Sequence, residues 1–278
     1  MKSIFTRLCF TFFTLLIFSS CSSLGLTKDC EVTENKITDS NFEVSVLKYA
    51  MNQVATKSLI IIPPTGGTNF IDRSYAKQFC HAHYDVYILN GWTRDQETTF
   101  ELAIHERFYS NAQTAVRIVL DHIQTKSIGL LGTSVGALHA SVAASLHPRI
   151  NAVFAILGGT PIADVIVTSD QPAMVDLRNA RKKKYGFTTD EQQRTAIDQV
   201  LSKEPYKLGL GFKNKALGLV IAEQDQTVAT ATQYQLKKFW QPQKVITIST
   251  DHFWGIVRTW LFHSNEILDF FEKNQPKS

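Results

Sequence analysis

Two hydrophobic patterns alternate along most of the chain. Short apolar stretches rich in β-branched side chains are typical of strands covered on both faces, and between them apolar residues recur at helical spacing. The strands are predicted over 59–62, 84–90, 127–131, 152–157, 216–222 and 244–248. The helices are predicted over 70–81, 101–123, 137–146, 229–240 and 253–271.

This alternation decides the fold class. A strand, a helix and a further strand form a right-handed crossover, so a series of such units builds a parallel sheet with helices on both faces. Residues 42–49 differ, because apolar and polar side chains alternate there with a period of two, which is typical of a half-exposed antiparallel edge strand. We therefore expect one α/β domain over 42–274, which a chain of 278 residues with 44% hydrophobic content can support.

The alternation stops after the strand at 152–157. Residues 159–215 contain no clear strand but include helical patches such as 190–201. This segment is long for a loop, so we expect it to fold as a small helical cap. Its basic run is interpreted either as a solvated helix face or as a patch that meets an anionic lipid or substrate. The run consists of Arg178, Arg181, Lys182, Lys183 and Lys184.

Residues 1–20 have the composition of an export signal. Two basic residues precede an apolar run over 8–18, which is too short to span a membrane. Small residues directly before Cys21 resemble the bacterial lipoprotein processing box. We expect the signal to be removed, Cys21 to be acylated, and residues 21–41 to tether the domain to a membrane of the cell envelope, with a short edge strand near 30–34. The alternative is an ordinary signal peptide that leaves a soluble periplasmic or secreted protein.

The charges of the chain nearly balance. There are 29 Lys and Arg against 25 Asp and Glu, and without residues 1–20, which hold only Lys2 and Arg7, the count is 27 against 25. This balance gives no reason to expect nucleic acid as a partner.

The four cysteines become interpretable once export is assumed. Cys9 leaves with the signal and Cys21 is acylated, so Cys30 and Cys80 are the remaining thiols in an oxidising compartment. They form either a disulfide that ties the amino-terminal arm to the domain or two separate buried thiols, and the sequence does not decide between these.

The centre of the chain carries a Gly-x-Ser-x-Gly motif, Gly132-Thr133-Ser134-Val135-Gly136. It follows a predicted strand and precedes a predicted helix, so the strand turns sharply into the helix with one hydroxyl at the turn. Glycine is required at the flanks because a Cβ would crowd the tight turn. Ser134 is therefore a candidate nucleophile.

A nucleophilic serine also needs a base and a carboxylate that orients the base. His252 follows the strand at 244–248, and Asp225 follows the strand at 216–222. Catalytic groups gather beyond the carboxyl ends of parallel strands, so these positions favour a shared site. Alone, Asp225 would be read as a turn residue or helix cap, with Glu223 as a substitute carboxylate. Asp251 is excluded as the acid because adjacent side chains do not readily meet through the Nδ1 atom of the imidazole.

Two backbone amides are candidates for stabilising the oxyanion of such a reaction. One is the amide of Val135, next to the nucleophile, and the other belongs to the loop Thr65-Gly66-Gly67, with Gly66 and Gly67 as the candidates. Glycines after a buried strand let an amide turn toward a ligand with no side chain in the way. The alternative is a tight turn between a strand and a helix without a catalytic role.

The chain resembles the α/β-hydrolase family. The resemblance is carried by Ser134, Asp225 and His252 in that order, by the Gly-Thr-Ser-Val-Gly motif and by Gly66-Gly67, and it covers about residues 42–274. It implies a mostly parallel eight-stranded sheet, a catalytic triad in this order and a helical cap before the acid. Family esterases often carry His-Gly-Gly-Gly at the oxyanion loop, where this chain has Pro64-Thr65-Gly66-Gly67.

These residues predict a serine hydrolase of the cell envelope that cleaves a small acyl substrate, a carboxylic ester or thioester. No metal and no organic cofactor are expected, because no His, Cys and carboxylate residues show ligand spacing. Acyl transfer to another acceptor and peptide cleavage are alternatives that use the same triad. A non-catalytic binding module of the same fold is the alternative from another class.

Overall fold

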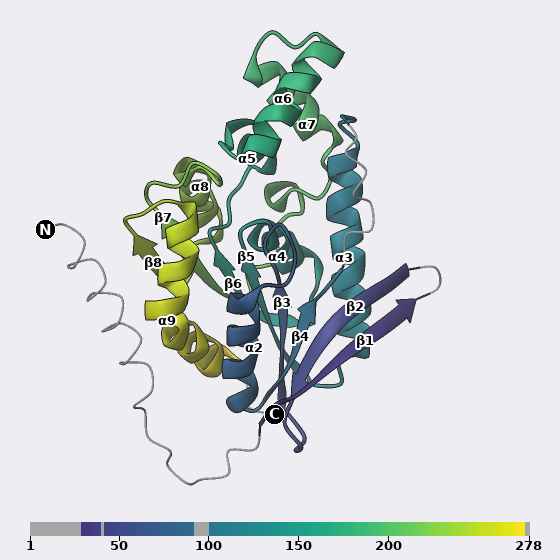
Figure 1. Ribbon diagram of the computed structural model, residues 1–278, viewed down its shortest axis with the longest axis vertical. Coiled ribbons are helices and arrows are strands. Elements are labelled where there is room, and N and C mark those ends of the chain that lie inside the picture. Colours follow the sequence, from purple (N-terminus) through teal and green to yellow (C-terminus); the bar gives the residue numbers. More distant parts are fainter. Residues whose placement is uncertain (1–28, 40–41, 92–99, 276–278) are drawn as a thin grey trace, which may run out of the picture.

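The computed structural model describes residues 29–39, 42–91 and 100–275. An eight-stranded sheet with the order β1-β2-β4-β3-β5-β6-β7-β8 forms the centre of the molecule (Figure 1). The pairs β1/β2 and β2/β4 are antiparallel, and the other pairs are parallel, which confirms the predicted fold class. The strands are β1 Glu31–Asp39, β2 Phe42–Ala50, β3 Lys57–Ile62, β4 Tyr84–Leu89, β5 Ser127–Thr133, β6 Ile150–Ile156, β7 Ala216–Ala222 and β8 Lys244–Ile248.

The antiparallel edge of the sheet differs from the prediction. β2 was expected at the edge, but β1 lies outside it and pairs along its whole length, from Glu31 opposite Ala50 to Asp39 opposite Phe42. β1 is largely exposed and polar, so it has no hydrophobic signal beyond the short strand expected near 30–34. The segment expected as a tether thus contributes a full strand to the sheet.

Two helical layers cover the sheet (Figure 1). On one face, α2 (Phe70–His81) and α9 (His252–Asn274) share a core with the sheet. On the other face, α3 (Ile104–His122), α4 (Val135–Leu146) and α8 (Thr230–Trp240) form a second core with it. The apolar stripes that predicted these helices are the sides that pack on the sheet.

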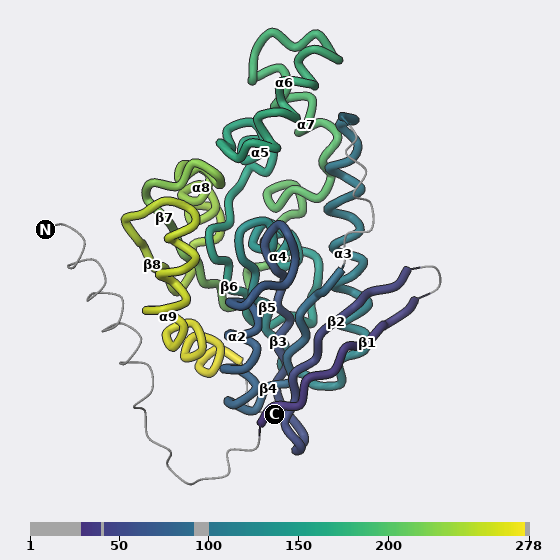
Figure 2. The backbone as a smooth tube through the Cα atoms, in the orientation of Figure 1, coloured from purple at the N-terminus to yellow at the C-terminus, as the bar shows by residue number. Residues whose placement is uncertain are grey.

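The chain leaves the sheet after β6, forms a group of helices beyond the end of the strands, and returns to β7 (Figure 2). This group is α5 (Ile162–Thr168), α6 (Pro172–Tyr185), α7 (Asp190–Val200) and the 3-10 turn η1 (Pro205–Lys207). Its apolar side chains share a third core with residues of α3 and α4, such as Tyr109 and Leu138. The segment therefore packs directly over the helix that follows Ser134.

The basic run of this segment serves internal packing. Arg181 is fully buried, and its guanidinium donates to the carbonyl oxygens of Phe100 and Glu101 and to Nε2 of His105 at 2.7 Å. Burial, together with the neighbouring charge of Arg181, lowers the pKa of His105 to about 3, which keeps the imidazole neutral so that it can accept this bond.

The neighbouring basic residues also have partners within the domain. Arg178 donates to the carbonyl of Ser169 at the end of α5. Lys182 forms an ion pair with Asp190 at 2.8 Å, and Lys184 pairs with Glu101. The expectation of a solvated face is therefore correct for Lys183 and Lys184, which are exposed, and wrong for Arg181, which is buried. The hydrogen bonds and ion pairs of the run hold the cap helices to each other and to the segment before α3.

A disulfide joins Cys30 to Cys80, with the Cα atoms 6.2 Å apart. It ties the start of β1 to the last turn of α2 and decides the alternative that the sequence left open. The expected signal over 1–20 and the lipidation site Cys21 lie outside the described residues. Within the described ranges, no helix has the length and apolar character needed to cross a membrane.

A buried carboxylate fastens the base of the cap. Glu204 accepts hydrogen bonds from the hydroxyl of Thr160 at 2.6 Å and from the amide of Ile162 at 2.7 Å. Burial raises the pKa of Glu204 to about 7, although these two hydrogen bonds lower it. The folded state therefore holds this proton more tightly than the unfolded state, and the resulting stabilisation is lost as the pH rises toward 7.

The Glu204→Gln variant should show a weaker loss of stability with rising pH. The isosteric amide can still accept from Ile162 and donate to the hydroxyl of Thr160, but it does not titrate. Between pH 5 and pH 8 the free energy of unfolding of the wild type should fall by about 2–3 kcal/mol more than that of the variant. Urea denaturation at both pH values measures this difference, and identical pH dependence would show that Glu204 does not titrate in this range.

Candidate active site

Ser134 lies at a strained turn between β5 and α4. Its backbone has φ 55° and ψ −120°, a conformation that is unfavourable for any residue with a side chain. The surrounding backbone maintains it: the amide of Ser134 donates to the carbonyl of Ile156 at 2.8 Å, and its carbonyl accepts from Ala137 at 2.8 Å. The turn therefore presents the hydroxyl at the carboxyl end of the sheet.

The two glycines of the motif have the steric role expected from the sequence. A Cβ on Gly132 would lie 2.3 Å from the carbonyl oxygen of Gly136, and a Cβ on Gly136 would lie 2.0 Å from the carbonyl oxygen of Ile62. Both contacts are with backbone atoms, which cannot move without displacing α4 or β3. The motif is thus required by the packing of the helix against two strands.

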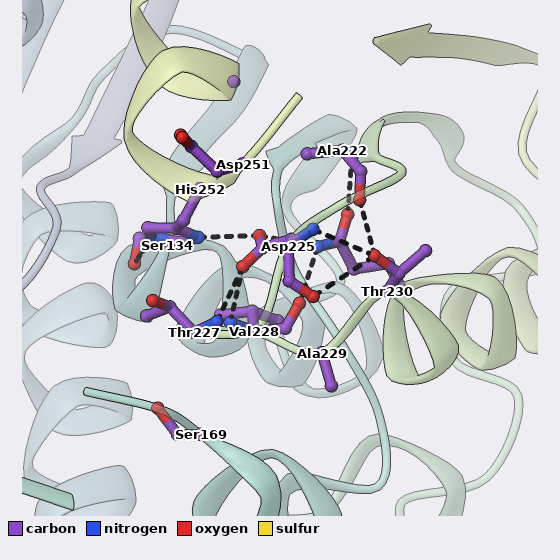
Figure 3. A network of polar contacts seen from close by, with 12 residues as sticks. Ser134, Ser169, Ala222, Asp225, Thr227, Val228, Ala229, Thr230, Asp251 and His252 are labelled. Carbon is purple, nitrogen blue, oxygen red and sulfur yellow. Dashed lines mark hydrogen bonds and ion pairs between the residues drawn. The ribbon is translucent and has the colours of Figure 1, made fainter. Parts of the chain in front are cut away.

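The structure brings the three distant candidates together (Figure 3). The hydroxyl of Ser134 lies 2.9 Å from Nε2 of His252, and Nδ1 of His252 lies 2.7 Å from a carboxylate oxygen of Asp225. Both distances are those of hydrogen bonds. His252 is the first residue of α9, and Asp225 follows β7, so all three elements meet at the carboxyl edge of the sheet.

The carboxylate of Asp225 is buried and held by several donors. One oxygen accepts from the amides of Thr227 and Val228, each at 2.9 Å. The other oxygen, which accepts from His252, also accepts from the side-chain amide of Gln233 at 2.8 Å. Donors on both oxygens fix the orientation of the carboxylate.

The other carboxylates considered for this role lie elsewhere. Asp251 caps α9 by accepting from the amide of Trp254 at 2.9 Å, and its side chain points away from the imidazole (Figure 3). Glu223 is exposed, and its amide continues the backbone pairing with Ile248. Asp225 is therefore the carboxylate that meets His252.

The amide of Val135 lies at the first residue of α4, where a helix presents amides without intrahelical partners and a partial positive charge. The loop after β3 lies beside it, because Gly136 abuts the carbonyls of Ile62 and Pro63. Gly66 and Gly67 have φ values of +98° and +86°, which only glycine adopts readily. The amide of Gly67 donates to Pro64 at 3.2 Å.

The hydrogen bond from Gly67 to Pro64 distinguishes the two glycines expected at the oxyanion site. The amide of Gly67 is used within its own turn, which makes the amide of Gly66 the better second donor. Both glycines remain candidates by position, since the loop that contains them adjoins the helix terminus beside Ser134.

One supporting residue was not found from the sequence. Gln233 is fully buried on α8, donates to Asp225 and to the carbonyl of Val228 at 2.7 Å, and accepts from the amide of Ala222 at 3.0 Å. A glutamine within an amphipathic helix carries no local signal for such a role. Its spacing of eight residues from Asp225 is informative only once the loop between them is known to fold back.

The arrangement can move one proton between Ser134 and His252 while Asp225 orients the imidazole. Among residues 29–39, 42–91 and 100–275, no group of three or more His, Cys, Asp and Glu side chains is placed to hold a metal ion.

No family model and no curated protein sequence matches the chain. Solved structures do. An acylaminoacyl peptidase from Pyrococcus horikoshii matches with a TM-score of 0.67 at 14% identity, over 94% of this chain but only 45% of its own. An acetyl xylan esterase from Thermoanaerobacterium sp. matches with a TM-score of 0.67 at 12% identity, over 91% of this chain and 86% of its own. An acetyl xylan esterase from Paenibacillus sp. R4 matches with a TM-score of 0.66 at 14% identity, over 89% and 90%.

This chain therefore spans less than half the length of the peptidase and most of the length of the two esterases. At such identities the likeness establishes the fold alone. The fold is that of the α/β-hydrolases, which confirms the resemblance inferred from the sequence.

Replacing Gln233 by leucine should slow catalysis at the serine without weakening substrate binding. The variant loses a donor to the charged carboxylate of Asp225, and such bonds contribute about 1.5–3 kcal/mol, so kcat should fall about 10- to 100-fold while KM is unchanged. Steady-state hydrolysis of a p-nitrophenyl ester measures both constants.

Gln243→Leu is a control for this variant, because Gln243 also bonds to the backbone of β7, although it is exposed and Gln233 is buried. Gln243 accepts from the amide of Leu217, near the start of β7, at 2.6 Å, whereas Gln233 accepts from Ala222 at the end of the same strand. Gln243 does not contact Asp225. Both variants should lose stability, but only the change at Gln233 should lower kcat. An equal fall of kcat in the two variants would show that Gln233 has no positioning role.

Proposed function

We propose that this protein is a serine hydrolase that cleaves a carboxylic ester or thioester through an acyl-enzyme on Ser134. The observation that carries the proposal is the continuous hydrogen-bonded relay from Ser134 through His252 to Asp225, with distances of 2.9 Å and 2.7 Å. A binding module of the same fold has no need to hold a serine in a strained turn against an imidazole that is itself bonded to a carboxylate.

In the first half of the reaction, the oxygen of Ser134 attacks the acyl carbonyl while Nε2 of His252 takes its proton. The tetrahedral oxyanion forms beside the first amides of α4, where Val135 and a glycine amide of the 65–67 loop donate to it. Asp225 holds Nδ1–H and stabilises the imidazolium. His252 then gives the proton to the leaving alcohol or thiol as the carbonyl bond to that group breaks.

In the second half, water takes the place of the departed group. His252 removes a proton from the water as its oxygen attacks the acyl-enzyme, and the same amides stabilise the second oxyanion. Collapse of this intermediate breaks the bond to Ser134, which recovers its proton from His252 and releases the acid. No electron transfer and no cofactor are needed for this sequence of steps.

Peptide cleavage would use the same triad and the same acyl-enzyme, and differs in the leaving group, which is an amine instead of an alcohol or thiol. Acyl transfer to an alcohol or amine would use the same acyl-enzyme and differs only in the nucleophile that enters. Product analysis with water and with added alcohols distinguishes these two outcomes.

A fluorophosphonate probe tests the nucleophile directly. The wild type and Ser141→Ala should be labelled, and Ser134→Ala should not. Ser141 is the matched control because it lies on α4, the helix that Ser134 precedes, is fully buried and donates to the carbonyl of Leu138. Labelling of Ser134→Ala would contradict the proposal.

Asp225→Asn should lower kcat on p-nitrophenyl butyrate by about 10⁴-fold, because the amide stabilises the wrong tautomer of His252.

We further propose that the chain is exported and held at a membrane of the cell envelope by acyl chains on Cys21. The support is the sequence before that residue, together with the Cys30–Cys80 disulfide, which fits an oxidising compartment. Metabolic labelling with a fatty-acid analogue should mark the wild type and Cys9→Ser but not Cys21→Ser. Labelling that persists in Cys21→Ser would contradict acylation at this position.

A further inference from the structure

The sides of α2 and α9 that point away from the sheet expose large apolar side chains. On α9, Trp254, Leu261 and Phe262 are 52%, 53% and 71% exposed, and on α2, Phe70 is 64% exposed. Positions 254, 258, 261 and 262 of a helix share one face. The outer face of a helix that covers a sheet is ordinarily polar, so this apolar surface is not explained by the packing of the domain.

The two helices form one surface. They lie side by side over the same face of the sheet (Figure 1), and Nε1 of Trp260 donates to the hydroxyl of Ser74 at 2.9 Å. The ring of Trp260 also contacts that of Phe70 edge to face, with the centroids 5.3 Å apart. We call this surface the α2–α9 face. Its exposed members are Phe70, Arg73, Lys77, Trp254, Arg258, Leu261 and Phe262.

The charge of the α2–α9 face is basic. Arg73, Lys77 and Arg258 are exposed beside the aromatic rings. The acidic residues of the two helices are placed otherwise. Asp72 is buried, Glu266 pairs with Lys244, Glu272 pairs with Lys57, and the exposed Asp269 lies in the last turns of α9, beyond Phe262. Asp251 caps the start of α9.

Both helices of this face begin at the active site. His252 opens α9 and is followed by Phe253 and Trp254, whose rings contact each other edge to face with centroids 5.5 Å apart. The glycine loop at 65–67 leads into α2. The upper end of the α2–α9 face is therefore the rim at which an acyl group would reach Ser134.

At the other end of the α2–α9 face, the last turn of α2 is bonded to the segment that follows Cys21, the expected acylation site. The disulfide fixes Cys30 to Cys80 in the last turn of α2. Cys30 lies nine positions after Cys21, which allows a reach of at most about 30 Å, and α2 with 12 residues is about 18 Å long. An acyl chain on Cys21 can therefore enter a bilayer on which the α2–α9 face lies.

We propose that the α2–α9 face docks on a bilayer that contains anionic phospholipid, and that the active site takes its ester substrate from that surface. The second part rests on the proposed hydrolase function. Aromatic and aliphatic side chains enter the interfacial region of a bilayer, while arginine and lysine bind the anionic headgroups. A second copy of the chain is a poorer occupant, because a symmetric contact would place the basic side chains of two copies against each other.

Tryptophan fluorescence tests the docking. The full chain is expressed, purified after any processing by the cell, and mixed with vesicles of phosphatidylcholine and phosphatidylglycerol whose acyl chains carry bromine atoms. Bromine quenches only indoles that reach the bilayer, so the wild type should be quenched. Trp254→Phe should lose much of this quenching. Trp240→Phe should retain it, because Trp240 is 3% exposed and packs on the opposite face of the sheet.

The basic side chains are tested by neutralisation. A basic residue near an anionic surface strengthens binding about fivefold, so Arg73→Gln, Lys77→Gln and Arg258→Gln together should weaken docking about 100-fold and abolish the quenching. The matched control is Lys183→Gln, Lys237→Gln and Lys238→Gln, which removes the same charge from exposed positions on the cap and on α8. Control quenching should equal that of the wild type.

Hydrolysis of a soluble p-nitrophenyl ester is measured in parallel. Both triple variants should keep the wild-type rate on this ester, and only the variant of the α2–α9 face should lose hydrolysis of a long-chain ester presented in the vesicles. A wild type that is quenched but hydrolyses neither ester would refute the proposed hydrolase and leave the docking supported. Absence of quenching in the wild type, with or without dimerisation through this face, would overturn the docking.

Discussion

The close approach of α4 to the end of β3 is the constraint on which the geometry of the candidate active site depends. A side chain at Gly136 would lie 2.0 Å from the carbonyl oxygen of Ile62, so the helix touches the backbone of the strand. Because of this contact, the first turn of α4 and the loop after β3 lie next to each other. Backing the helix away to admit a Cβ would separate the amide of Val135 from that loop and would relax the turn that holds Ser134 at positive φ.

The relay joins the two helical layers of the molecule. Ser134 precedes α4 and Asp225 precedes α8, both on one face of the sheet, whereas His252 begins α9 on the other face. The imidazole crosses the edge of the sheet to meet both groups. The geometry of the relay therefore depends on the packing of both layers. The buried side-chain amide of Gln233 fixes the carboxylate of Asp225 relative to α8.

The sequence predicted the elements that carry a periodic apolar signal. The bounds of α2, β7 and β8 agree with the expected ranges because each has a sharp transition from apolar to polar residues at its ends. β1 was underestimated because Glu31–Asp39 is polar and its strand conformation comes from pairing with β2. A pattern read along one segment has no access to a partner strand.

The site shows the same division between local and tertiary information. Ser134, Asp225 and His252 could be proposed because each follows a recognisable strand, and parallel strands end at one edge. Gln233 could not, because its role exists only where α8 meets the acid loop. The burial of Arg181 within the basic run could not be predicted for the related reason that its partners, the backbone carbonyls of Phe100 and Glu101, come from a distant part of the sequence.

The outer surfaces of the two helical layers differ in a way that internal packing does not require. On α3, the outward positions carry Arg117 and Asp121, which pair with each other at 3.0 Å as expected for a helix facing water. On α9, a helix of similar amphipathic pattern, the outward positions carry Trp254, Leu261 and Phe262. Polar side chains at these positions would stabilise the fold equally well, because none of the three completes the core beneath the helix. The fold therefore does not require the apolar surface, which begins two residues after His252, the first residue of α9.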